Sequence, residues 1–344
     1  MLELIKSELT RLFGPEFAQL AGTVYWTVIA PLFAQPTLAP LFIASSVLVG
    51  GAYLLRKSEP GSKSFLSRCF AFLVPRHIYG HRSAILDYKF YVATQYLLHF
   101  VKIAQFAVGV AAVLGIAEGV RRLLELILGP SDGTGQPGLI ASIVFTVVMA
   151  LAFDAARFLS HWVFHKSPVL WEFHKVHHSA EVLTPFTAFR AHPVDQFVEF
   201  LFRAIAVSAV SGAFGYFYPE GVEELTILGY SGITFIFHLT VHLRHSHIPV
   251  GFGRLSTILI SPFMHQLHHS TAPEHFDKNF GFIFSFWDRL AGTLYVPRPD
   301  ERFEVGLPDE ADRFQSLWDL YVRPFGAATR ALFAPRGSAG TGLG

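Results

Sequence analysis

The chain has little of what most soluble proteins carry. Only one of its 344 residues is cysteine, Cys69, which excludes a disulfide framework, a cysteine-ligated zinc finger and a four-cysteine iron–sulfur cluster. Charged residues make up 15% of the chain, against about a quarter in a typical soluble domain, whereas 51% are hydrophobic. The formal net charge of +1 gives no argument for a nucleic-acid partner. A membrane protein is therefore the first inference.

Apolar segments long enough to cross a bilayer, about 20 residues, occur in four or five places. The first, 21–55, is broken by Pro31, Pro36 and Pro40, so it is either one kinked span or a tight hairpin. The others cover 91–120, a segment that begins at Leu139, then 197–216 and 225–243. We expect an interfacial amphipathic helix over 1–20, a membrane-embedded domain over 21–300 and a cytoplasmic tail over 301–344 with a disordered, Gly-rich end.

Basic residues predict the orientation of these spans. The segment 56–89 carries seven Lys or Arg residues, whereas the connection 218–224 carries none. Cytoplasmic connections are enriched in Lys and Arg, so 56–89 is predicted to be cytoplasmic. Counting spans from there places 161–196 and 244–344 on the same side, and most of the histidine-rich sequence lies in these segments.

The histidines follow a repeated spacing. The sequence WEFHKVHHS at 171–179 shares its His-x-x-His-His-Ser ending with MHQLHHS at 264–270. With 17 histidines among 344 residues, His-x-x-His-His would occur by chance only about 0.04 times in the chain. Positions i, i+3 and i+4 share one face of an α-helix, so each cluster is expected to direct its imidazoles one way. The four clusters are His161 and His165; His174, His177 and His178; His238 and His242; and His265, His268 and His269.

Local signals predict that these clusters lie on helices. Ser167-Pro168 and Ser261-Pro262 each have the pattern of an N-cap followed by proline at the first helical position. A span that begins at Leu139 would cross a core of about 30 Å by residue 158, so His161 and His165 would follow within two turns. His238 and His242 are likewise expected to end the last apolar segment.

Ten clustered imidazoles require a partner. If charged they would repel one another, and if neutral and unpaired near lipid each would keep unmet hydrogen-bonding groups. A bound metal removes both problems, and ten ligands suit two ions. Imidazole binds iron, zinc, copper and nickel alike, so the residues do not choose the metal. The remaining isolated histidines are expected to be surface or hydrogen-bonded core residues, namely His77, His81, His99, His245 and His247.

Longer motifs around the clusters carry a family resemblance. They are Asp154-x-x-x-Phe158-x-x-His161-x-x-x-His165, LWEFHKVHHS at 170–179, Arg190-Ala191-His192-Pro193, and HQLHHSTAPEHFDKNFGFIFSFWDRLAGTLY at 265–295. Together they resemble the fatty acid hydroxylase / sterol desaturase superfamily of integral-membrane non-haem di-iron enzymes, over roughly residues 80 to 300. The resemblance implies an all-α membrane protein of four to five spans, with a cytoplasmic helical cap that carries the histidine site.

The resemblance also implies a chemistry. The ten cluster histidines would ligate two iron ions, which zinc can replace on overexpression. With O2 and two electrons, the enzyme would hydroxylate or desaturate an unactivated C–H bond of a membrane lipid such as a sterol, a hopanoid or a fatty acyl chain. Metal-bound imidazoles need hydrogen-bond acceptors on their other ring nitrogen, and His192 and His275 could serve there or as a substrate gate. The candidates near the clusters are Asp154, Glu172, His192, Asp195, Glu274, His275, Asp277 and Asp288.

The electrons are expected to come from another protein. The chain has no Gly-rich dinucleotide loop and no evident haem domain, so a ferredoxin or a cytochrome with its reductase is the predicted donor. Two other functions stay open at this stage. A histidine-rich membrane metal transporter or sensor could use the same residues. A zinc-dependent membrane hydrolase would need a general base beside the metal, for which Glu172 or Glu274 could serve.

Overall fold

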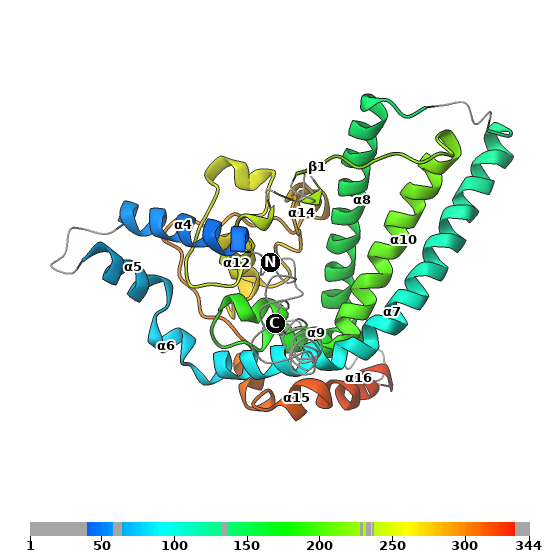
Figure 1. Cartoon of the computed structure of the whole chain (residues 1–344). Helices are drawn as coiled ribbons and strands as arrows, with labels where there is room; N and C mark the ends of the chain where they lie inside the picture. Colours follow the sequence, from blue (N-terminus) through cyan, green and yellow to red (C-terminus); the bar gives the residue numbers. More distant parts are fainter. Residues whose placement is uncertain are drawn as a thin grey trace, which may run out of the picture.

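Long helices dominate the fold of the chain (Figure 1). A computed structural model describes residues 40–57, 64–131, 136–227, 230–231, 235 and 237–333. Within these residues the structure is mostly helical, as predicted, with one short antiparallel pair of strands, β1 (Thr226–Ile227) and β2 (Tyr230–Ser231). The predicted interfacial helix over 1–20 and the Gly-rich end lie outside the described residues.

Three long helices stand side by side on one flank of the molecule (Figure 1). They are α7 (Arg82–Leu128), α8 (Leu139–Lys166) and α10 (Pro193–Phe217), and α10 packs against both of the others. A side chain at Gly212 would overlap the backbone of Ala117, so glycine lets α10 and α7 approach closely. At the far end of this layer the hydroxyl of Tyr216 donates a hydrogen bond to the carbonyl oxygen of Gly129 (2.9 Å).

Two of these helices, α8 and α10, are long and apolar enough to cross a membrane. Among the described residues no other helix meets that test. The predicted segment 91–120 lies inside the continuous helix α7, and the described part of the first segment forms α4 (Pro40–Lys57). The structure therefore supplies two candidate spans, and the larger number stays a prediction.

The segment 225–243 does not form the membrane span that its apolar sequence predicts. Its described residues include β1, β2, a turn at 239–240 and the four-residue helix α12 (Val241–Arg244). Hydrophobicity alone cannot distinguish a spanning helix from a segment that folds back over a protein surface, so this prediction is wrong over the described part.

Helix α9 (Pro168–His178) lies at the foot of the three-helix layer (Figure 1). Helix α9 and helix α13 (Pro262–His268) both begin as predicted. The Ser167 and Ser261 side chains accept hydrogen bonds from Leu170 N and Met264 N, and proline follows each cap. The remaining helices are α5 (Phe65–Leu73), α6 (Arg76–Tyr79), α14 (Phe286–Ala291), α15 (Leu317–Tyr321) and α16 (Arg323–Phe333), and the 3-10 helices are η3 (Pro185–Phe189), η4 (Gly253–Thr257), η5 (Pro273–His275) and η6 (Pro308–Arg313).

A compact apolar core packs against helix α9. Leu86 and Phe90 at the start of α7 pack with Val176 of α9 and Leu320 of α15, and Phe314 completes the cluster. Because Val176 directly precedes His177, this core fixes the end of α9 that carries adjacent histidines.

Candidate metal centre

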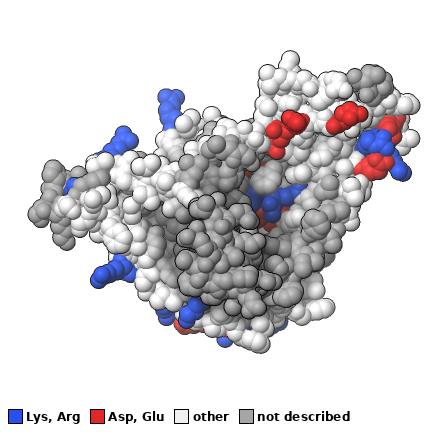
Figure 2. Space-filling model, viewed as in Figure 1, with Lys and Arg blue, Asp and Glu red and all other residues white. Residues whose placement is uncertain are grey.

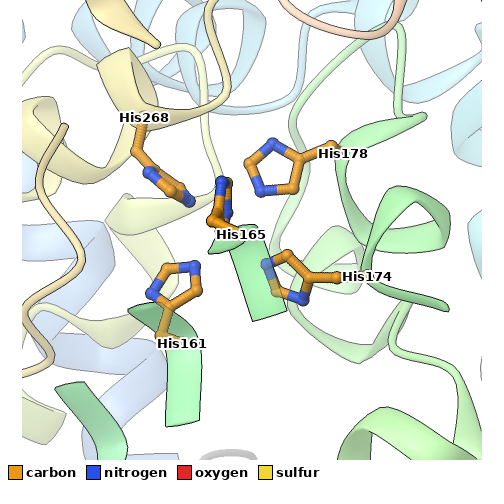
Figure 3. Close-up of side chains that lie close together, drawn as sticks. All are labelled: His161, His165, His174, His178 and His268. Atoms are coloured by element: carbon orange, nitrogen blue, oxygen red, sulfur yellow. The ribbon is translucent and has the colours of Figure 1, made fainter. Parts of the chain in front are cut away.

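The first histidine group collects five imidazoles from three helices. His161 and His165 come from the end of α8, His174 and His178 from α9, and His268 from α13. One ring nitrogen from each lies within 4.8 Å of the others. Figure 3 shows the five rings turned towards a common space. This spacing is within reach of a single ion.

The second group lies beside the first and collects four imidazoles. They belong to His177, His245, His265 and His269, all buried, with one nitrogen each within 4.8 Å of the others. The Nε2 atom of His245 lies 3.3 Å from Nε2 of His177 and 3.0 Å from Nε2 of His265. The rings of His178 and His269 stack across the two groups with centroids 4.6 Å apart. The chain could therefore hold two ions side by side.

Each His-x-x-His-His cluster divides its rings between the two groups. On α9 the i, i+4 pair His174 and His178 faces the first group, while His177 faces the second. At α13 the assignment is reversed, because His265 and His269 face the second group and His268 the first. The expectation that each cluster points one way is thus wrong for these two, and the two helices bridge both groups.

Two of the ten predicted ligands, His238 and His242, belong to neither group, and His245 takes part instead. The prediction assumed a continuous helix through 225–243, but the chain turns at 239–240, so His238 and His242 do not share a helical face. His245 follows α12 directly and is buried against the second group. The spacing His242-x-x-His245 was the signal in the sequence that could have identified it.

The first group presents its nitrogens in the form that binds metal. The Nδ1 N–H of His161 donates to the Phe280 carbonyl oxygen (3.0 Å), that of His268 to the Lys278 carbonyl oxygen (2.7 Å), and that of His174 to Asp195 Oδ2 (2.8 Å). A proton fixed on Nδ1 leaves the lone pair on Nε2. All five Nε2 atoms of the group are buried without a hydrogen-bond partner. Buried polar atoms are rarely left unpaired, so these residues fit a metal ion.

Burial keeps neutral those imidazoles of the two groups that do not lie on the candidate spans α8 and α10. Loss of hydration, reinforced by neighbouring histidines, lowers the pKa of His177, His178, His265 and His269 well below the usual value. Loss of hydration also lowers the pKa of His245 and His268 to about 3. Neutral imidazole is the metal-binding form, so no proton has to leave these rings at neutral pH.

Asp154 and Asp288 act on the histidines through a loop. Asp154 accepts hydrogen bonds from the backbone N–H groups of Ile283 (2.7 Å) and Phe284 (3.0 Å). Asp288 accepts from the N–H groups of Phe280 and Gly281, both at 2.8 Å. The loop they hold carries the Phe280 carbonyl that positions His161. Neither carboxylate has a direct hydrogen bond to a histidine of the two groups in the described structure.

Among the other predicted supporting residues, Asp277 lies beside a grouped histidine, whereas Glu172 and Glu274 do not belong to either group. Asp277 Oδ1 lies 3.6 Å from His165 Nδ1, and the same carboxylate pairs with Lys166. Glu172 instead pairs with Lys175 (2.8 Å), and Glu274 is exposed. Neither glutamate belongs to a histidine group, so the arrangement gives no support to a hydrolase that uses one of them as its base.

His192 and His275 hold other parts of the chain together. His192 caps α10 and donates from Nε2 to the Tyr321 carbonyl oxygen (3.1 Å). His275 Nε2 lies 3.0 Å from Glu301 Oε1, and its Nδ1 lies 2.8 Å from Ser270 Oγ. Both predicted residues therefore have structural hydrogen bonds.

A buried arginine anchors the end of α9. Arg190 is 1% exposed and pairs with Asp87 of α7 through Nη1 (2.9 Å). Its Nε donates to the Val176 carbonyl oxygen (3.0 Å), and its Nη2 donates to Ser179 Oγ (2.8 Å). The guanidinium thus holds the backbone on both sides of His177 and His178. The sequence motif contained Arg190, but its partner Asp87 lies 103 residues away and could not be predicted.

A cavity of about 170 Å³ opens onto both groups. Its lining includes His161 and His174 of the first group and His177, His245 and His265 of the second. Figure 2 shows a recess with basic and acidic atoms at its base, in a surface that is largely uncharged. The fold and this site define a helical, membrane-type protein whose buried histidines can hold two ions next to a small cavity.

Comparison with known proteins shows which family the chain resembles. Residues 146–293 match the fatty acid hydroxylase family. The chain is 26% identical over 186 residues to an alkylglycerol monooxygenase of Caenorhabditis elegans, 27% over 166 residues to the ornithine lipid hydroxylase OlsE of Rhizobium tropici, and 26% over 157 residues to a lathosterol oxidase of Mus musculus. The predicted resemblance to the fatty acid hydroxylase / sterol desaturase superfamily is therefore confirmed, and these relatives are lipid-modifying oxidoreductases.

The similarity covers part of each protein. The matched segments are 52%, 48% and 45% of this chain and 34%, 46% and 46% of the three relatives. The chain thus spans less than half the length of these curated relatives. No solved structure matches it.

Proposed function

We propose that the chain is an O2-dependent di-iron oxidoreductase that hydroxylates or desaturates an unactivated C–H bond of a membrane lipid. The observation that carries this proposal is the convergence of nine histidines into two adjacent groups, with five buried Nε2 atoms that have no hydrogen-bond partner. The matched residues, 146–293, include all nine of these histidines.

The donor set supports iron as the resident metal. His161, His165, His174, His178 and His268 would hold one ion, and His177, His245, His265 and His269 the other. All nine ligands are neutral imidazoles, which bind ferrous iron, and neither group includes a thiol or a phenol that an oxidant could destroy. When bound, two irons would supply the activation of O2 and the removal of hydrogen from carbon. Zinc can displace ferrous iron, so metal content after overexpression is a poor guide.

The protein's own residues would position the substrate and exclude water. Phe164, Phe237 and Phe282 give the cavity apolar walls beside the histidines, which suits a hydrocarbon. Asp195 and the carbonyls of Lys278 and Phe280 would keep the histidine rings oriented during turnover. The low volume of the cavity admits part of a lipid, with the rest remaining outside.

We also propose a multi-pass membrane location with the histidine site at the cytoplasmic side. Support comes from the two candidate spans and from the basic segment 56–89. The C-terminal end of α8 carries His161 and His165, and the first turn of α10 carries Asp195, which contacts His174. An external electron donor such as a ferredoxin or a cytochrome with its reductase is part of the proposal, because the family chemistry needs two electrons per turnover.

The test is lipid-dependent oxygen consumption. The protein would be loaded with ferrous iron without oxygen, placed in lipid nanodiscs and supplied with a reductant and candidate lipids. We expect oxygen uptake that requires both lipid and reductant, and a product heavier by one oxygen or lighter by two hydrogens in mass spectrometry. His177→Ala should insert normally, lose metal and abolish turnover, whereas the exposed His77→Ala should behave as the unmodified protein.

Two results would contradict the proposal. The first is a His177→Ala protein with full metal content and activity. The second is metal flux into liposomes without lipid-dependent oxygen uptake, which would indicate a transporter.

A further inference from the structure

The cavity beside the histidines contains an ion pair that the metal centre does not use. Arg157 of α8 pairs through Nη1 with Glu199 Oε1 of α10, and both residues line the cavity. The same carboxylate oxygen lies 3.1 Å from Nε of Arg203. Charged side chains on helices that can cross a membrane are costly and usually serve a function. Apolar residues would be sufficient if these positions served helix packing alone.

The cluster has a spare hydrogen-bond donor. The Nε atom of Arg157 is buried without a hydrogen-bond partner. Glu199 already faces both guanidinium groups, so the groups missing from this site are acceptors. The guanidinium carbon of Arg157 lies 3.6 Å from the ring centroid of Phe282, which holds the guanidinium plane against the cavity wall. An oxygen-bearing group in the cavity would complete the arrangement.

The cluster lies close to the histidines. Arg157 precedes His161 by four residues on α8, so both side chains share one face about 6 Å apart along the helix. Glu199 follows Asp195 by four residues on α10, and Asp195 holds the ring of His174. A ligand that contacts Arg157 therefore reaches the first histidine group within one or two helical turns. One to two turns are about 5 to 11 Å, which corresponds to roughly six carbon–carbon bonds of about 1.5 Å each.

We propose that Arg157, oriented by Glu199, binds the oxygen-bearing polar group of the substrate lipid. The substrate class is then an amphipathic lipid that reacts close to its polar end, within about six bonds, and not in the middle of a long chain. The phenylalanine walls take the first part of the hydrocarbon, and the remainder of the chain extends out of the 170 Å³ cavity. This inference rests on the proposed function for its reaction but not for its binding step.

The binding step is tested by photo-cross-linking of the zinc-loaded protein in nanodiscs, where no turnover occurs. Three diazirine probes with 16-carbon chains would be compared: hexadecylglycerol, palmitic acid and hexadecane. We expect at least one polar probe to half-saturate at a concentration about tenfold lower than hexadecane, the factor that one hydrogen bond to a charged group supplies. Arg157→Met should remove this preference and leave the hexadecane value unchanged. Glu199→Gln, which keeps the side-chain size, should reduce the preference.

The control is Arg122→Met. Arg122 also pairs with a glutamate, Glu118, but is 71% exposed on α7 and does not line the cavity. Zinc content and melting temperature would be measured for each variant, and Glu199→Gln decides the matter if Arg157→Met does not fold. The proposal is overturned if the unmodified protein shows no preference for either polar probe, or if Arg157→Met or a folded Glu199→Gln keeps the full preference.

The position of the reaction gives an independent readout. Mass spectrometry should place the new oxygen or double bond near the polar end of the product. A mid-chain product would refute this inference and leave the oxygenase intact. Conversely, a polar preference in cross-linking without any oxygen uptake would refute the proposed function and keep the binding site.

Discussion

Three histidines of the first group are oriented by the group that holds their second ring nitrogen. For His161 and His268 that partner is a backbone carbonyl, and for His174 it is the Asp195 carboxylate. Each partner accepts a hydrogen bond from the Nδ1 N–H and thereby fixes the tautomer whose Nε2 faces the group. A backbone acceptor cannot be removed by substituting its own residue, whereas the Asp195 carboxylate can be removed.

Substitutions of His245 and His242 distinguish the histidine groups seen in the structure from the set predicted by sequence spacing. We expect His245→Ala to lose metal from the second group, so that bound metal falls from two equivalents to about one, because three imidazoles would remain there. His242→Ala should keep both equivalents. The measurement is metal analysis after anaerobic loading, with a melting curve to confirm folding. Metal loss in His242→Ala with none in His245→Ala would reverse the assignment.

Much of the grouping of the histidines was predictable from their spacing in the sequence. Eight of the nine grouped histidines were named from spacing, because the Ser-Pro caps define where α9 and α13 begin and hence which faces their histidines share. His245 was missed because an apolar run was interpreted as a helix. The carbonyls of Lys278 and Phe280 could not be predicted, since a backbone oxygen is present in every residue.

At the scale of elements, the loop 277–281 shapes the first group. Asp277 and Asn279 adopt positive φ values of 58° and 59°, which is unusual outside glycine. Asn279 is held by its Nδ2 donating to the Met264 and Tyr295 carbonyl oxygens (3.1 and 2.8 Å) and its Oδ1 accepting from Tyr295 N (2.8 Å). Its two neighbours, Lys278 and Phe280, provide the carbonyls for His268 and His161.

Asn279→Ala should therefore weaken metal binding by about 10-fold to 100-fold, the usual effect of disturbing a ligand's hydrogen-bond partner. Asn279→Gly loses the same side-chain bonds but accepts a positive φ, so its loss should be smaller. Competition with a graded series of chelators would measure both. Equal affinity in the two variants and the unmodified protein would show that this loop does not position the histidines.

Substitution of Arg190 tests how strongly this side chain stabilises the end of α9. Arg190→Met leaves Asp87 buried without its partner and should lower the free energy of unfolding by about 3–5 kcal/mol. Denaturant unfolding in detergent would measure it. Arg82→Met is the matched control, since Arg82 is 61% exposed in its pair with Glu181 and should contribute less than about 1 kcal/mol. The double variant Arg190→Met with Asp87→Leu should recover part of the loss.

On the scale of the whole molecule, the histidines join elements from distant parts of the chain. Removal of metal by a chelator should lower the melting temperature by roughly 5–10 °C, because an ion at a hundred times its dissociation constant contributes about 2.7 kcal/mol. Thermal unfolding with and without chelator would show this. A His177→Ala, His265→Ala double variant should respond less, and an equal response would assign the shift to an unspecific effect.

The membrane architecture was less predictable than the site. Apolar length correctly located α8 and α10 as helices that can cross a bilayer, because both are uninterrupted. It failed at 225–243, where the described residues fold into short strands and a short helix. Such a segment is as apolar as a membrane span. Its fold depends on the contacts of α12 with α4 and α13, which the local sequence does not encode.

The division of each His-x-x-His-His cluster between the two groups has a consequence for assembly of the centre. An ion captured by the first group immobilises α9 and α13, and these segments carry three of the four imidazoles of the second group. The entropic cost of ordering them would then already be met when the second ion arrives. A titration with ferrous iron should accordingly be sigmoidal, with half-loaded protein scarce at every ratio.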